Sequence, residues 1–248
     1  MMFFVGLHHP GDVWRFEFAM VSVNVLTKRR SKPTFRRWLM DSGAFTTLEM
    51  HGRYIDEPEA YAHRVWEYRN VGELMAAVSQ DFMCDPFMLA KTGGSVADHQ
   101  RWTIERYDRI KAELERLEQH YAPWGQKSPY LMAVLQGYSP EEYVDHIRQY
   151  GDRLKPGMWV GVGSVCKRNS KPEQVLAVLT AIHAERADLL LHGFGLKITT
   201  LEHPGVADHL HSSDSMAWSL AERLTGGDAN HWRGAAAYCA RVAQVLAA

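Results

Sequence analysis

Short apolar runs alternate with longer amphipathic stretches along most of this sequence, and this pattern constrains the fold more than any other feature. The apolar runs have the length of buried strands, and the stretches between them have helical periodicity. Repeated strand-then-helix order indicates a parallel sheet covered by helices, because parallel strands need crossover connections. We expect strands near residues 3–7, 20–26, 37–40, 75–79, 130–135, 158–162, 189–192 and 209–212.

The expected helices complete this pattern. Ser139-Pro140-Glu141-Glu142 combines a capping serine, a proline at the first position and acids in the first turn, which is typical of a helix start. Together the elements predict an α/β fold, a (β/α)8 TIM barrel, with residues 1–248 as a single domain. A doubly wound sheet is the alternative, but its G-x-G-x-x-G fingerprint is missing. The expected helices span residues 57–69, 96–120, 140–150, 172–185, 216–224 and 231–246.

Composition limits the class of protein. The net charge of −1 gives no overall attraction to nucleic acid, so such binding must come from local patches. No apolar stretch is long enough to span a bilayer, and the opening residues lack the basic region of a signal peptide. Three scattered cysteines form no C-x-x-C pair, so we expect no structural zinc. These features predict a soluble cytoplasmic protein.

Polar residues follow several of the expected strands. Asp41, Asp81, Gln136, Gly163-Ser164 and Asp214 all occupy such positions. A barrel places catalytic groups at the carboxyl ends of its strands, so we expect these residues to form one site. Each acid alone would also suit the capping of a following helix.

Their chemistry suits a glycosidic bond to a purine. Of two carboxylates such as Asp41 and Asp214, one can attack the anomeric carbon while the other handles the proton of the departing group. A carboxylate such as Asp81 can accept from guanine N1–H and the 2-amino group, and Gln136 can serve O6 or N7. Phe45 could stack on the base.

At these positions the sequence resembles the tRNA-guanine transglycosylases. Asp41-Ser42-Gly43-Ala44-Phe45 is similar to their D-S-G-G-F/Y motif, and Val134-Leu135-Gln136-Gly137 to their V-Q-G segment. Val162-Gly163-Ser164-Val165 resembles a G-G-L strand end, and Asp81 with Cys84 and Pro86 resembles their base-recognition segment. Ser213-Asp214-Ser215 lies where that family keeps its nucleophilic aspartate.

The resemblance implies a role for each matched residue. Asp214 would attack C1′ and form a covalent glycosyl-enzyme, and Asp41 would act as general acid and base. Phe45 and Phe194 would lie on the two faces of the base. The base-binding set is completed by Asp81, Gln136, Gly163, Ser164 and Ser42.

One departure from the tRNA enzymes changes the expected substrate. Their zinc-binding insertion is missing, and residues 163–168, the opening segment and the stretch around Asp214 resemble the DNA 7-deazaguanine transglycosylases (DpdA-type) of phages and bacterial modification clusters. That resemblance implies exchange of guanine in DNA for 7-cyano-7-deazaguanine (preQ0) or a relative. DNA, the deazaguanine base and accessory modification proteins are then the expected partners, in the host cytoplasm if a phage encodes the protein.

Two basic clusters are candidates for contact with the nucleic-acid backbone. The first contains Lys28, Arg29, Arg30 and Lys32, just before the strand that carries Asp41. The second contains Lys167 and Arg168, after the Gly163 strand end. A basic run between strands is equally typical of a solvated loop.

Other functions stay open on the sequence alone. Base exchange in tRNA would use the same chemistry. A metal-dependent barrel hydrolase would need an ion, for which His203, His209 and His211 with Asp214 are candidate ligands. A silent accessory subunit is a third alternative, although both catalytic acids are present. We expect no cofactor and no metal.

Overall fold

The computed structural model describes residues 1–27, 29, 31–224 and 226–247. Within these residues the strands form one sheet in the order β5-β4-β3-β2-β1-β9-β8-β7-β6, and every pairing is parallel. The strands are β1 (Met2–Gly6), β2 (Phe18–Ser22), β3 (Arg37–Asp41), β4 (Glu73–Val78), β5 (Leu131–Met132), β6 (Val134–Leu135), β7 (Trp159–Val162), β8 (Leu190–Gly193) and β9 (Ser212–Ser215).

The sheet closes through a short interruption at Ala133. β5 pairs with β4, β6 pairs with β7, and only Ala133 separates the two. The Ala133 carbonyl accepts a hydrogen bond from the Gly161 amide of β7 at 2.8 Å, so the interruption is itself bridged to β7. β5 and β6 are therefore two halves of one strand, and the α/β barrel predicted from the sequence is confirmed.

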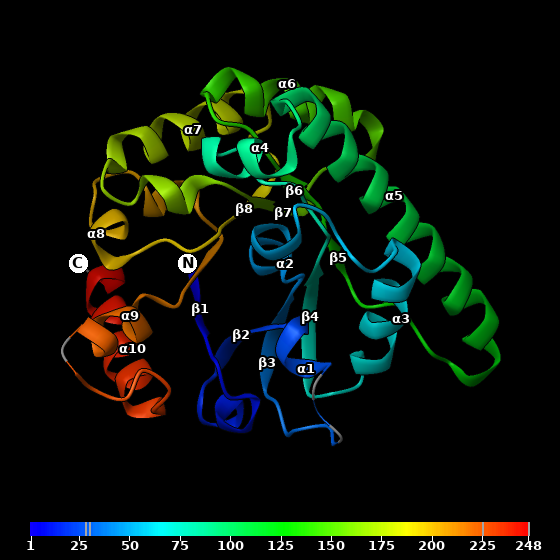
Figure 1. Ribbon diagram of the computed structural model, residues 1–248, viewed down its shortest axis with the longest axis horizontal. Helices are drawn as coiled ribbons and strands as arrows, with labels where there is room; N and C mark the ends of the chain where they lie inside the picture. The colour runs from blue at the N-terminus through cyan, green and yellow to red at the C-terminus, as the bar shows by residue number, and fades with distance from the viewer. Residues whose placement is uncertain (28, 30, 225, 248) are drawn as a thin grey trace.

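Helices surround the strands, as Figure 1 shows for α5, α6 and α7, which curve around one side of the sheet. α10 packs over β1 and buries Ala235, Tyr238 and Val242. No helix in the described ranges is both long and apolar enough to cross a membrane. The helices are α1 (Val23–Leu26), α2 (Ala44–His51), α3 (Pro58–Tyr68), α4 (Pro86–Thr92), α5 (Val96–Tyr121), α6 (Pro140–Tyr150), α7 (Pro172–Glu185), α8 (Ile198–Leu201), α9 (Ala217–Leu224) and α10 (Trp232–Ala247).

Alternate strand side chains separate two apolar cores. Successive residues of a strand point to opposite faces, so one set fills the barrel and the other meets the helices. Trp38 belongs to the outer set and donates its indole N–H to the Val71 carbonyl at 2.7 Å. The interior set is Phe4, Met20, Leu39, Ala76, Val78, Met132, Val134 and Trp159.

The boundaries differ most from the prediction at two strands. The second strand, predicted at 20–26, is β2 (Phe18–Ser22), and the chain continues as the one-turn helix α1. The last strand, predicted at 209–212, is β9, so Asp214 lies inside a strand. A Ser-Ser-Asp-Ser strand has no apolar alternation to reveal it. Its hydroxyls are instead satisfied internally: Ser213 donates to the Gly193 carbonyl at 2.8 Å.

The prediction lacks helices α2 and α4 as well as the one-turn helices α1 and α8, whereas the six predicted helices are all present. Helices α2 and α4 both lie after strand ends, and both are short, with 8 residues in α2 and 7 in α4. α2 begins after Gly43, whose backbone is left-handed, and α4 begins at an Asp85 cap. Such short helices present too few turns to show periodicity.

Candidate active site

Five strands bring the predicted polar residues to one end of the barrel. Asp41 ends β3, Asp214 lies in β9, and the others follow β4, β6 and β7 within three residues. Because all strands are parallel, their carboxyl ends share one face. The carboxylates influence one another there: the Asp214 charge raises the pKa of Asp41, and the Asp41 charge raises that of Asp81. The structure therefore brings the three predicted acids into one site.

Asp41 is held in a turn that only glycine can make. Its Oδ2 accepts a hydrogen bond from the Gly43 amide at 3.1 Å. Gly43 has a φ of +71°, and a Cβ there would lie 2.3 Å from Nδ2 of Asn24, which donates to the Gly43 carbonyl. Burial and then the nearby Asp214 raise the pKa of Asp41 to about 6, while bonds from Gly43 and Ser22 oppose the shift. Asp41 can thus exchange a proton near neutral pH.

Asp81 and Gln136 are joined in a buried chain of hydrogen bonds. Gln136 donates through Nε2 to Oδ2 of Asp81, and the Ser164 hydroxyl donates to Oε1 of Gln136 at 2.8 Å. The Cys84 amide in turn donates to Ser164 Oγ at 2.9 Å. This chain fixes which end of the Gln136 amide faces Asp81. Burial raises the pKa of Asp81 to about 7, and the Gln136 bond opposes that rise.

Gly163 and Ser164 lie against Gln136. A Cβ on Gly163 would lie 2.1 Å from Nε2 of Gln136, so the close approach requires glycine. Tyr143 donates to the Gly163 carbonyl at 2.6 Å and holds this segment from the α6 side. Ser164 has a φ of +60°, an uncommon conformation for a residue with a side chain. The turn directs its hydroxyl toward Gln136.

Ser42 adds a buried hydroxyl beside Asp81. Ser42 is 3% exposed, and its hydroxyl has no hydrogen-bond partner among the described residues. It still lies close enough to Asp81 to lower the pKa of that carboxyl. A buried hydroxyl without a partner is costly, so this position suits contact with a bound ligand.

Asp214 lies at the less buried end of a second chain of hydrogen bonds. The sequence did not reveal this chain. Oδ1 of Asp214 accepts from the Gly195 amide at 3.0 Å and lies 3.3 Å from Nε2 of His192. Nδ1 of His192 lies 2.8 Å from Ser212 Oγ, which also accepts from Nε1 of Trp159 at 2.8 Å. His192 lies in an apolar run of the sequence, and that pattern predicts only that it belongs to a strand.

The two predicted aromatic residues differ in exposure. Phe45 is 41% exposed at the start of α2, and Lys167 Nζ lies 4.3 Å from the centre of its ring. Phe194 packs inward, with its ring centre 4.7 Å from that of His192 and its edge over Gly161, which leaves space for it. Phe45 therefore lies on the rim of the site, and Phe194 belongs to its floor.

The first basic cluster lies apart from the site in its described members. Lys28 and Arg30 fall outside the described residues. Arg29 is exposed, and its Nε donates to the nearby Ser31 carbonyl at 3.4 Å. Lys32 donates to the Glu67 carbonyl at 2.5 Å, near the end of α3, which leads to the amino end of β4. Lys32 is therefore near the opposite end of the barrel from Asp41.

The second basic cluster is divided. Lys167 is exposed at the rim, between the rings of Phe45 and Phe87, at 4.3 Å and 6.0 Å from their centres. Arg168 is 5% exposed, donates to the Tyr138 carbonyl and lies 4.4 Å from the Tyr138 ring centre. Lys167 is thus placed to meet a ligand, whereas the contacts of Arg168 favour support of the loop after β6.

The histidines offered as metal ligands are dispersed. His209 contacts Thr180 and His183, and His211 packs on Trp159 at the amino end of β9. In the part of the chain that the structure describes, no three His, Cys, Asp or Glu side chains are grouped to hold a metal ion. The nearby Cys166 is also unsuited to nucleophilic chemistry, because burial raises its pKa to about 11.

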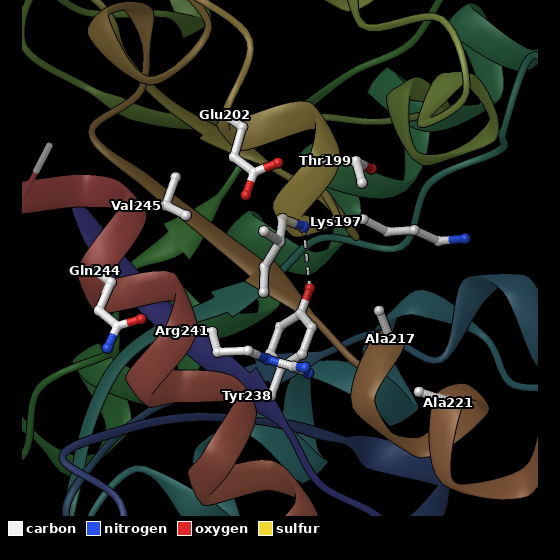
Figure 2. Close-up of a pocket in the computed structure, with 10 residues that line it drawn as sticks. Lys197, Thr199, Glu202, Ala217, Ala221, Tyr238, Arg241, Gln244 and Val245 are labelled. Carbon is white, nitrogen blue, oxygen red and sulfur yellow. Dashed lines mark hydrogen bonds between the residues drawn. The ribbon is translucent and has the colours of Figure 1, made fainter. Parts of the chain in front are cut away.

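A separate pocket of about 440 Å³ lies between α8, α9 and α10. Figure 2 shows Tyr238 at the centre of this pocket. The Tyr238 hydroxyl accepts a hydrogen bond at 3.2 Å from the Ile198 amide, at the start of α8. Glu202 is its carboxylate, and Lys197 and Arg241 are its cations. None of the predicted site residues lines this pocket.

The fold and the site together define an α/β barrel with three interacting carboxyl groups at the carboxyl ends of its strands. The chain belongs to the DpdA family, described as DeoxyPurine in DNA protein A, whose model matches residues 2–244. The family places the protein among enzymes of DNA modification, with DNA as substrate. A search of curated proteins finds no match to this chain.

The raised pKa of Asp81 predicts a pH-dependent effect on stability. Its folded-state pKa of about 7 lies above the ordinary 3.8, so stability from this group is present below pH 4 and is lost as pH rises through 7. Asp81→Asn should therefore raise Tm at pH 8 and change it little at pH 5, since Asn can still accept from Gln136. The exposed Asp152→Asn, measured at the same two pH values, is the matched control. An equal shift for Asp81→Asn at pH 5 and pH 8 would contradict this prediction.

The coupling of Asp41 to Asp214 predicts a second titration effect. Asp214→Asn removes a negative charge that raises the pKa of Asp41, while burial, the larger cause, remains. The pKa of Asp41 should therefore fall below about 6 without reaching its ordinary value. Carboxyl ¹³C NMR of both proteins across pH 3–9 measures this fall. An unchanged Asp41 titration would show that the two carboxylates do not interact.

Proposed function

We propose that this protein exchanges a guanine in DNA for a 7-deazaguanine base such as preQ0, through a covalent glycosyl-Asp214 intermediate. The observation that carries the proposal is the interacting pair Asp41 and Asp214 at the same end of the barrel as the buried polar groups of Asp81, Gln136 and Ser164. Membership of the DpdA family supports DNA as the nucleic acid, in preference to tRNA. The reaction class is therefore that of a pentosyltransferase.

The first half-reaction uses both acids. An Asp214 carboxylate oxygen attacks C1′, the C1′–N9 bond breaks, and its electron pair leaves with guanine. Protonated Asp41 gives its proton to the departing base. A pKa of about 6 leaves part of Asp41 protonated at neutral pH while permitting the reverse transfer.

The second half-reaction reverses these transfers. The incoming 7-deazaguanine loses its N9 proton to the Asp41 carboxylate, and N9 attacks C1′. The bond from C1′ to Asp214 breaks and restores the free carboxylate. Water in place of the base would hydrolyse the intermediate, so a tightly held incoming base protects the product.

The base-reading role falls to the buried Asp81–Gln136 chain. Asp81 Oδ2 is occupied by Gln136, so the other oxygen is the one available to guanine N1–H and the 2-amino group. Gln136 keeps a second N–H for O6. Because a duplex guanine must leave its stack to reach this site, extrusion costs about a few kcal/mol before any chemistry.

Label transfer tests the proposal directly. Labelled preQ0 and guanine are each incubated with duplex DNA, single-stranded DNA and tRNA, with native protein and with Asp214→Asn. We expect label in DNA only with the native aspartate, and a protein–DNA adduct that survives denaturation. Label in tRNA would overturn the choice of nucleic acid. Incorporation by Asp214→Asn at the native rate would remove Asp214 as the nucleophile.

The two basic clusters predict different effects on DNA binding. Lys167→Ala should weaken DNA binding and reduce the slope of log K against log salt by about 0.9, the change expected for one lost phosphate contact. Lys32→Ala should change neither, because Lys32 is held at the α3 end. Fluorescence anisotropy with a labelled oligonucleotide at several salt concentrations measures both. An equal loss in the two variants would contradict the placement of DNA at the strand-end face.

A further inference from the structure

The Asp214 carboxylate is held asymmetrically. Both of its hydrogen bonds, from the Gly195 amide at 3.0 Å and from His192 Nε2 at 3.3 Å, meet Oδ1. Oδ2 makes no hydrogen bond to any described residue. An oxygen without hydrogen bonds is the better nucleophile of the two, because no donor must be displaced before it attacks.

The backbone donor to Oδ1 is built into the chain. Gly195 has a φ of +63°, and a Cβ there would lie 2.8 Å from the Cβ of Cys166. Only glycine therefore allows the chain to pass between the β7 loop and Asp214. The segment after β8 is consequently fixed with its N–H directed at Oδ1.

The side-chain donor is set by two further hydrogen bonds. Trp159 Nε1 can only donate, so Ser212 Oγ accepts from it at 2.8 Å. The serine proton is then available to Nδ1 of His192, the other partner of Ser212 Oγ in the structure, at 2.8 Å. A neutral imidazole that accepts at Nδ1 carries its proton on Nε2. That proton faces Oδ1 of Asp214.

We propose that His192 is a positioning residue for the nucleophile, and that Oδ2 of Asp214 is the oxygen that attacks C1′. This inference rests on the transglycosylase chemistry proposed above. When Oδ2 bonds to C1′, Oδ1 becomes the ester carbonyl and keeps its two donors. Those donors stabilise charge that returns to the carboxylate when the incoming base displaces it, so they assist both half-reactions.

His192 is completely buried among aromatic side chains and has no access to a base. Its ring lies beside Phe4, Trp159 and Phe194 in the barrel interior. The base-reading residues Asp81 and Gln136 come from other strands. Loss of the imidazole should therefore slow adduct formation and leave the affinity for the free base unchanged.

Kinetics of paired variants test this role. His192→Leu should slow adduct formation by about 100-fold, as expected for one lost donor at a charge-bearing oxygen. His192→Gln, which keeps a side-chain N–H at similar reach, should recover most of that loss. His211→Leu, which removes a histidine packed on the same Trp159, should behave as the native protein. Equal losses for Leu and Gln, or a weakened affinity for preQ0 by calorimetry in both, would overturn the assignment.

A measurement without catalysis keeps this inference separate from the proposed function. In ¹⁵N-histidine NMR at pH 8, the His192 signals, assigned by their loss in His192→Gln, should show the Nε2–H tautomer. Ser212→Ala should disturb that tautomer, because Nδ1 loses its donor. An Nδ1–H tautomer in the native protein would overturn the proposal, even if label transfer succeeds. If no adduct forms in native protein but the Nε2–H tautomer is present, the proposed function fails and the arrangement around Oδ1 stands.

Discussion

The parallel direction of every strand is the constraint on which the rest of this structure depends. Parallel pairing places the carboxyl ends of all strands on the same face. Residues more than a hundred positions apart in the sequence, such as Asp41 and Asp214, therefore come close together. The closure at Ala133 completes this arrangement, because it brings Asp81, which follows β4, and Gln136, which follows β6, together. A site made from five strands is possible only because the barrel is closed.

Burial then determines the chemistry of that site. Asp41 and Asp81 lie in a region where charge is poorly solvated, and their raised pKa values of about 6 and about 7 follow mainly from this desolvation. The same burial makes their ionised forms unfavourable for the folded protein. Proton transfer near neutral pH is therefore obtained at the expense of stability, a compromise common at active sites.

The interior of the barrel has a second function besides packing. Trp159 fills the interior core, yet its indole N–H starts the chain that passes through Ser212 and His192 to Asp214. A buried chain of this kind has few alternative geometries, since a member that turned away would break a buried hydrogen bond. The apolar core and the polar site are thus continuous in this protein.

The sequence by itself determined the class of fold, the carboxyl-end location of Asp41 and Asp81, and most helix boundaries, because periodicity, caps and glycine turns act over a few residues. Tertiary structure alone decided which distant groups meet. The imidazole of His192 faces Asp214 only through the register of β8 and β9. Lys32 and Lys167 look alike in sequence but lie at opposite ends of the barrel. Such outcomes depend on barrel closure, which joins residues far apart along the chain and leaves no local pattern.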